Sequence, residues 1–151
     1  MKRWHVVVWA ALAAGAALAQ NGGGGLYIAG AGFSFKQAVT QGLAKNPGGT
    51  RFFVLALPPQ TKALALDAPA NRVADRRRAG DGGAVFLVCQ RDVDKGAVVL
   101  SKLVPGVVPV RGWPPPGSNE LPKGQLFYAD EDPTKLPASV TLLRRLRATC
   151  S

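Results

Sequence analysis

The sequence predicts a single α/β domain built on a mainly parallel sheet. Short apolar runs alternate along the chain with segments of helical spacing, which is the pattern of parallel strands joined by crossover helices. The strand-like runs are almost continuously apolar, as in residues 51–57, and this is typical of strands buried on both faces. The chain has 151 residues and 47% hydrophobic content, which is enough for one globular domain with a buried core.

The predicted elements follow one another in the order β-α-β-α-β-α-β-loop-β-α. Predicted strands cover residues 26–29, 51–57, 84–88, 107–110 and 125–129, and predicted helices cover residues 33–43, 69–78, 90–95 and 137–149. Pro69 near the start of the second helix and Gly80 just past its end fit the usual helix boundaries. Residues 60–68 fit either a helical turn or a loop. Right-handed crossovers between five such strands predict a flavodoxin-like three-layer sandwich, with helices on both faces of the sheet.

The N-terminal segment has the pattern of a secretory signal peptide. A basic start at Lys2-Arg3 is followed by an uninterrupted run of apolar and small residues at 6–18 and by the small-x-small site at 17–19. We expect cleavage after Ala19, which would leave a flexible Gly-rich lead-in at 20–25 and the α/β domain at 26–151. A retained anchor is the alternative, but a membrane-spanning helix needs about 20 apolar residues. The expected location is therefore periplasmic or secreted, with no membrane attachment after cleavage.

Removal of this segment excludes several classes of chemistry. His5 is the only histidine and lies within it, so the mature chain would contain no imidazole. Ser-His-Asp and Cys-His nucleophile pairs are therefore excluded, as are zinc sites that use histidine. Two cysteines cannot form a four-cysteine metal site, and we expect no metal and no cofactor.

The basic residues favour an anionic partner without indicating nucleic acid. Loss of Lys2 and Arg3 lowers the formal net charge from +10 to +8. Two basic clusters lie on predicted helices, at 76–78 and 144–147. Most simply they are solvated helix faces, and otherwise they would attract small anions or an acidic protein. Export makes nucleic acid a poor partner.

Two further features allow weaker functional interpretations. Gly30-Ala31-Gly32 lies between a strand and a helix, as phosphate-binding loops do, but the third glycine of G-x-G-x-x-G and the Gly-Lys-Ser/Thr of a P-loop are missing. A tight turn is the simpler interpretation of that segment. Asp130-Glu131-Asp132 could hold a cation weakly, although an exposed acidic turn explains it better.

Cys89 is the leading candidate for a reactive group. It follows the apolar run 84–88 and precedes a short polar segment, so we expect it where a strand ends and a helix begins. A thiol at a helix N-terminus, with Arg91 and Lys95 nearby as candidate thiolate stabilisers, is expected to have a depressed pKa. A buried, inert cysteine is the competing interpretation.

Cys150 is a weaker candidate site. A disulfide with Cys89 is the default in an exported protein. However, a last helix that follows a fifth strand would begin at the sheet edge where Cys89 lies and end at the opposite edge. The two Cα atoms would then exceed the distance of about 7 Å that a disulfide allows. A free thiol or an intermolecular disulfide is therefore expected at Cys150.

Residues 86–113, FLVCQRDVDKGAVVLSKLVPGVVPVRGW, resemble the DsrE/DsrF-like family of sulfur-trafficking proteins. The shared pattern is a strand ending in Cys89, a helix closed by Gly96, a Pro105-Gly106-Val107 turn and a Val-rich strand ending at Gly112. The resemblance implies a flavodoxin-like fold and a persulfide carried on Cys89. It further implies a sulfur donor or acceptor protein, or a small anionic sulfur species, as partner, and a possible homo-oligomer.

Two functions remain open on these observations. In the first, a periplasmic DsrE-like protein binds or relays sulfane sulfur through Cys89: the thiolate attacks a donor and then passes the outer sulfur to an acceptor thiol. In the second, the domain is a non-catalytic exported binding or assembly module whose Cys89 is buried and inert. Either way the chain is a sulfur carrier at most, and not a hydrolase or a histidine-dependent enzyme.

Overall fold

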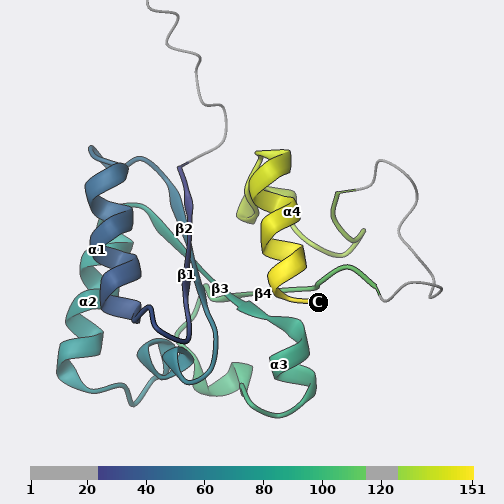
Figure 1. Ribbon diagram of the computed structural model, residues 1–151. Helices are drawn as coiled ribbons and strands as arrows, with labels where there is room; N and C mark the ends of the chain where they lie inside the picture. The colour runs from purple at the N-terminus through teal and green to yellow at the C-terminus, as the bar shows by residue number, and fades with distance from the viewer. Residues whose placement is uncertain (1–23, 115–125) are drawn as a thin grey trace, which may run out of the picture.

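The structure, a computed structural model, describes residues 24–114 and 126–151 (Figure 1). Its strands and helices are β1 (Leu26–Ala29), α1 (Phe35–Lys45), β2 (Phe52–Ala56), α2 (Ala70–Asp81), β3 (Ala84–Cys89), α3 (Gln90–Asp94), β4 (Val108–Val110) and α4 (Val140–Thr149). Short 3-10 helices occupy Gln60–Leu64 (η1), Leu100–Lys102 (η2) and Pro133–Lys135 (η3). The predicted signal peptide and most of the Gly-rich lead-in lie outside the described residues.

The sheet confirms the predicted α/β class and corrects the number of strands. All three neighbouring strand pairs are parallel, and the order across the sheet is β1-β2-β3-β4. The prediction of a fifth strand at 125–129 is wrong for the described residues 126–129, which are irregular. The sequential order also differs from the 2-1-3-4-5 order of flavodoxin-like sheets, in which the first strand lies inside.

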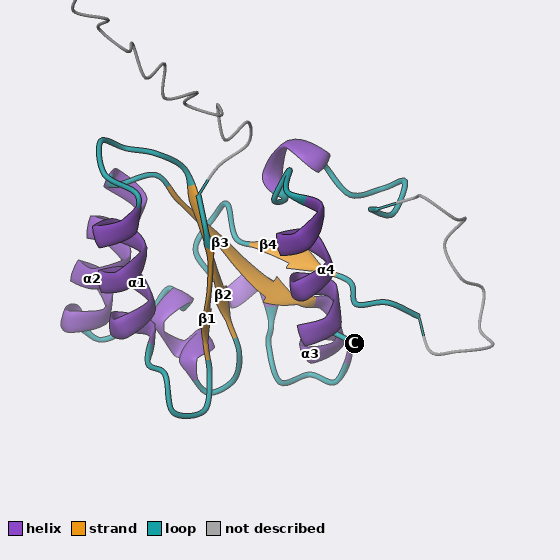
Figure 2. Ribbon diagram, turned by 45° about the horizontal axis from the view of Figure 1, so that its top comes forward, coloured by secondary structure: helices purple, strands orange, loops and turns teal. Residues whose placement is uncertain are grey.

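The sequential strand order separates the helices into two unequal layers. Right-handed crossovers between strands that advance in one direction place their helices on the same face of the sheet. Figures 1 and 2 accordingly show α1 and α2 side by side on one face and α4 alone against the other. Phe52 and Val54 of β2 contribute to the core under α1 and α2, whereas Phe53 and Leu55 contribute to the core under α4.

The start of α1 is fixed by a capping box. The Ser34 hydroxyl accepts a hydrogen bond from the Gln37 backbone N–H, and the Gln37 side chain accepts one from the Ser34 N–H. The Phe35 N–H donates to the side chain of Gln60 at 2.9 Å. These bonds satisfy N–H groups that a helix otherwise leaves unpaired at its start.

α1 packs so closely on β2 at Gly42 that there is no room for a side chain at this position. A Cβ atom at Gly42 would overlap the fully buried ring of Phe52. We expect Gly42→Ala to lower the free energy of unfolding by about 1–3 kcal/mol, although alanine is the better helix former. Gly80 of α2 is the matched control, because a Cβ atom there meets nothing within 4 Å. Gly80→Ala should raise stability by about 0.5–1 kcal/mol. Urea unfolding of both variants measures the difference, and two changes of the same sign would contradict this packing.

Candidate functional site

Cys89 lies where the sequence predicts it. It is the last residue of β3 and the N-cap residue of α3, with extended backbone angles (φ −80°, ψ 133°). In the parallel pairing of β3 with β4, Cys89 is opposite Val110, the last residue of β4. The sulfur therefore belongs to the carboxyl edge of the sheet, where open α/β proteins place functional groups.

Cys89 is not a free thiol, because it forms a disulfide with Cys150. The S–S distance is 2.01 Å and the two Cα atoms are 5.1 Å apart. Both residues are buried, with Cys89 at 0% and Cys150 at 2% exposure. The prediction of a free or intermolecular thiol at Cys150 is thus wrong in this structure.

The error follows from the missing fifth strand. The described residues 126–129, where the strand was expected, are irregular, and α4 runs toward the carboxyl edge of the sheet (Figure 1). Its C-cap residue is Cys150, which therefore meets Cys89 at the end of β3. The disulfide joins the end of the terminal helix to the middle of the sheet.

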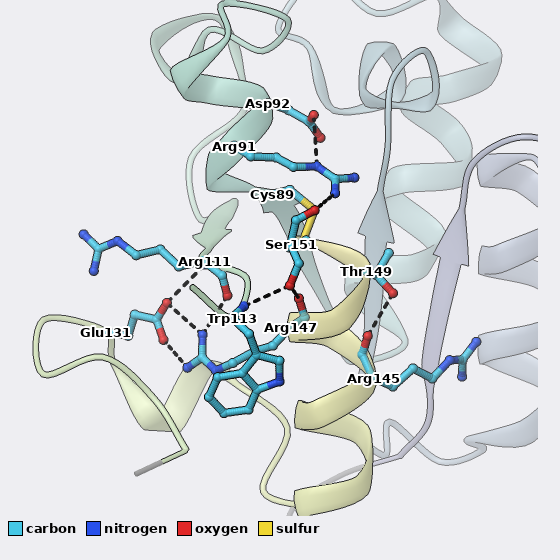
Figure 3. Close-up of a disulfide and its surroundings, with 11 residues drawn as sticks. Cys89, Arg91, Asp92, Arg111, Trp113, Glu131, Arg145, Arg147, Thr149 and Ser151 are labelled. Atoms are coloured by element: carbon cyan, nitrogen blue, oxygen red, sulfur yellow. Dashed lines mark hydrogen bonds and ion pairs between the residues drawn. A yellow bond between two sulfur atoms is a disulfide. The ribbon is translucent and has the colours of Figure 1, made fainter. Parts of the chain in front are cut away.

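The two candidate thiolate stabilisers differ in position. Arg91 reaches across the disulfide region and donates from Nη1 to the Ser151 carbonyl oxygen (Figure 3). Its Nε lies 3.6 Å from the Asp92 carboxylate. Lys95 is exposed at the C-cap of α3, the opposite end of that helix from Cys89. The structure therefore uses Arg91 to hold Ser151, just past the C-cap of α4, and does not bring Lys95 to the sulfur.

Ser151 adds a further connection beside the disulfide. Its hydroxyl donates to the Arg147 carbonyl oxygen at 2.8 Å and accepts from the Trp113 N–H at 3.0 Å (Figure 3). The last turn of α4 is thus held by covalent and polar contacts that come from β3, α3 and the segment after β4.

Arg147 lies at the centre of a buried polar cluster. Predicted as part of a solvated basic face, it is instead fully buried, with an exposed fraction of 0%. Its guanidinium pairs with Glu131 at 2.6 Å and lies over the rings of Trp113 and Tyr128 at 5.5 and 5.1 Å. It also donates to two backbone carbonyl oxygens at 2.8 Å, those of Leu126 and Arg111.

The acidic turn at 130–132 is therefore structural. Glu131 is the counterion of Arg147, and Asp132 accepts from the Thr134 N–H at the start of η3. Arg111 donates two hydrogen bonds to Asp130, at 2.5 and 2.7 Å, and this lowers the pKa of the Asp130 carboxyl. With all three carboxylates engaged, the suggested weak cation site gains no support.

A pocket of about 280 Å³ lies between β4 and this turn. Its lining residues are Gln90, Val107, Val108, Pro109, Arg111, Asp130, Glu131, Asp132, Lys135 and Leu136. Several of its charged groups already pair with one another or with Arg147. The pocket therefore offers few free polar groups to a ligand.

The turn at 30–32 shows no phosphate-binding geometry. Gly30 and Phe33 form an isolated antiparallel bridge. The N–H groups of Phe35 and Gln37, which a phosphate at the start of α1 would use, donate to Gln60 and Ser34 instead. The tight-turn interpretation is the one that the contacts favour.

Comparisons with known proteins identify no relative of this chain. No family model, curated protein or solved structure matches the chain. Within residues 24–114 and 126–151, no group of histidine, cysteine, aspartate and glutamate side chains could hold a metal ion. No helix in the same residues is long and apolar enough to cross a bilayer. What the structure defines is an α/β domain whose terminal helix is fastened to a parallel sheet by a disulfide.

Proposed function

We propose that the protein is an exported, non-catalytic binding or assembly module in which the Cys89–Cys150 disulfide is structural. The observation that carries the proposal is the buried disulfide itself, since both cysteines are at most 2% exposed. A sulfur atom in this state is neither a nucleophile nor a metal ligand, because those roles belong to the thiolate.

Export is part of the same proposal. Disulfides persist in oxidising compartments and are rare in the cytosol. The Cys89–Cys150 bridge therefore supports the signal peptide expected at residues 1–19, and with it a periplasmic or secreted location.

Sulfur relay is the second candidate, favoured by the position of Cys89 at the junction of β3 and α3. A relay through Cys89 requires the disulfide to be reduced first, after which the thiolate could take a sulfane sulfur from a donor. The DsrE-like resemblance extends over roughly residues 26–149 by element order and is specific only in the central residues 86–113. A flavodoxin-like sheet is supported by the parallel strands and by helices on both faces, but it would need a fifth strand and another strand order.

Thiol counting separates the two functions. We expect the oxidised protein to react with no thiol reagent in buffer or in guanidinium chloride, and to show two thiols only after reduction, because both cysteines are in one disulfide. Incubation of the unreduced protein with polysulfide, followed by mass spectrometry, should add no sulfur to Cys89. A thiol that titrates in the native exported protein, or a persulfide formed without reductant, would favour relay instead.

A further inference from the structure

Three of the large apolar side chains that are exposed in the described residues come from two loops whose backbones are hydrogen-bonded to each other. Leu66 is 62% exposed, Val99 45% and Leu100 38%. Leu66 follows η1, while Val99 and Leu100 lie at the start of η2. We call these three residues the Leu66 patch. Because large apolar side chains exposed together mark interaction surfaces more often than single ones do, the patch calls for a partner.

Backbone hydrogen bonds hold the two loops together. The Leu66 N–H donates to the Lys102 carbonyl oxygen and the Val104 N–H to that of Leu64, both at 2.9 Å. Ala65 and Leu103 form an antiparallel bridge between these bonds. The two loops that carry the patch are therefore held in a fixed arrangement. Less conformational entropy is then lost when a partner binds.

Arg76 of α2 also holds the loop that carries Leu66. Its Nη1 donates to the carbonyl oxygens of Ala63 and Ala65, at 2.8 and 3.0 Å. One of the arginines assigned to a basic cluster by the sequence therefore positions the loop that carries Leu66. The remaining basic side chains near the patch stay available to a partner.

A hollow with two basic residues in its lining is formed by residues on both sides of Leu66 in the sequence. Its volume is about 330 Å³, and the residues that line it are Pro59, Gln60, Lys62, Ala63, Pro69 and Arg72. Lys62 and Arg72 belong to no ion pair among the described residues. Lys102 is exposed on the other loop, and Asp67 is the one acidic residue within 57–69 and 96–106. The surroundings of the patch are therefore positively charged.

We propose that the Leu66 patch and the Lys62–Arg72 hollow form the docking site for an acidic, apolar segment of another protein. Apolar side chains of the partner cover Leu66, Val99 and Leu100, and a carboxylate enters the hollow between the two basic groups. This proposal rests on the binding-module function and names its surface and partner chemistry. Charge complementarity of this kind gives specificity and speeds association.

Charge and composition disfavour other occupants. A second copy of the chain would bring the same lysines to a two-fold interface, where like charges repel. A bilayer is usually met by tryptophan or tyrosine at the headgroup level, and the patch contains no aromatic residue. An acidic protein segment satisfies both the apolar and the cationic parts of the site.

The test uses the oxidised protein, immobilised and exposed to a phage-displayed library of random short peptides. We expect the enriched peptides to combine leucine, isoleucine or phenylalanine with aspartate or glutamate. A synthetic peptide of the enriched sequence should bind Leu66→Glu and Lys62→Glu more than about tenfold more weakly than the unaltered protein. Circular dichroism and urea unfolding check that each variant is folded.

Two exposed residues away from the patch provide matched controls. Val140, 41% exposed at the start of α4, controls for an apolar-to-acidic change, and Lys45 at the end of α1 controls for charge reversal. Val140→Glu should leave peptide affinity unchanged, and Lys45→Glu should lower it by less than about twofold. Equal loss in the controls, enrichment of basic peptides, or no enrichment would overturn the proposal.

Two further measurements distinguish the other occupants. Binding to phosphatidylglycerol vesicles that Leu66→Glu abolishes would overturn the protein partner in favour of a membrane. A dimer in sedimentation that Leu66→Glu dissociates would overturn it in favour of a second copy. If thiol counting confirms the buried disulfide and peptide selection fails, the surface is wrong while the module function stands. A free native thiol would instead contradict the function itself.

Discussion

Replacing both cysteines by alanine is expected to lower the free energy of unfolding by about 4 kcal/mol. In the chain-entropy account, a disulfide stabilises by restricting the unfolded chain, and the effect grows with the length of the closed loop. Cys89 and Cys150 are 61 residues apart in sequence, so their bridge closes a long loop. Since small domains are stable by only about 5–15 kcal/mol, the loss would remove much of the total.

The location of the bridge adds a structural consequence. Among the residues that the structure describes, α4 is the one α-helix against its face of the sheet (Figure 1), and it covers Phe53, Leu55 and Leu87. When the anchor at Cys150 is lost, the end of α4 can separate from the sheet. We therefore expect the double variant to bind an apolar fluorescent dye more strongly than the oxidised protein, before the main unfolding transition.

Urea unfolding without reductant measures the loss, and the reduced wild-type protein is its control. Replacing both cysteines, rather than one, avoids leaving a lone thiol that could form intermolecular disulfides. Wild-type protein treated with a phosphine reductant should unfold at nearly the same urea concentration as the double variant. A difference of less than about 1 kcal/mol between oxidised and reduced protein would show that α4 is held without the bridge.

The regular part of the fold follows from short-range patterns. Apolar runs of four to seven residues, separated by helical spacing and turn residues, predicted β1 to β4 and α1 to α4 close to their observed bounds. Cys89 at the junction of β3 and α3 followed from the same reasoning. These features depend on neighbours within a few residues, which the sequence displays directly.

Short-range patterns did not predict the disulfide. The expected position of Cys150 depended on a fifth strand at 125–129 that the described residues do not form. Leu126, Phe127 and Tyr128 have the composition of a strand, yet residues 126–129 are irregular: Leu126 packs against the core under α4, and Tyr128 makes contacts that are distant in sequence. The Tyr128 hydroxyl donates to the Gly112 carbonyl oxygen, and its ring lies under Arg147. Assigning a strand at 125–129 reversed the expected direction of the last helix and moved Cys150 to the wrong edge.

Helical periodicity did contain a signal for Arg147. Leu143, Leu146 and Cys150 are buried on one face of α4, and Arg147 lies four residues after Leu143 on that face. Because arginine is charged, a solvated position for Arg147 was the simpler interpretation of the sequence. The counterion Glu131 is 16 residues away in sequence, and nothing in the local pattern connects the two.

Replacing Arg147 by methionine is expected to destabilise the protein by about 3–5 kcal/mol. Methionine keeps a long flexible side chain but removes the guanidinium, so the Glu131 carboxylate is left with its main partner missing. Glu131 is itself only 9% exposed. Breaking a buried ion pair from one side is costly because the remaining charge is uncompensated. The Leu126 and Arg111 carbonyl oxygens lose their donor as well.

Arg144 supplies the matched control, because it is exposed on the same helix. Arg144→Met makes the same chemical change and should alter stability by less than about 0.5 kcal/mol. The carboxylate can be tested separately with Glu131→Gln, which keeps the shape and removes the charge. If an unpaired Glu131 causes much of the loss, Arg147→Met combined with Glu131→Gln should be more stable than the sum of the single effects implies.

Urea unfolding of the four variants decides between two roles for Arg147. Strong coupling to Glu131 means that the pair acts as one unit, fixing residues 126–136 against the end of α4. Additive losses would mean instead that Arg147 stabilises mainly through its two carbonyl acceptors and the rings of Trp113 and Tyr128. In either case the loss should exceed that of Arg144→Met, because Arg147 alone joins the segment after β4, the acidic turn and the helix that the disulfide anchors.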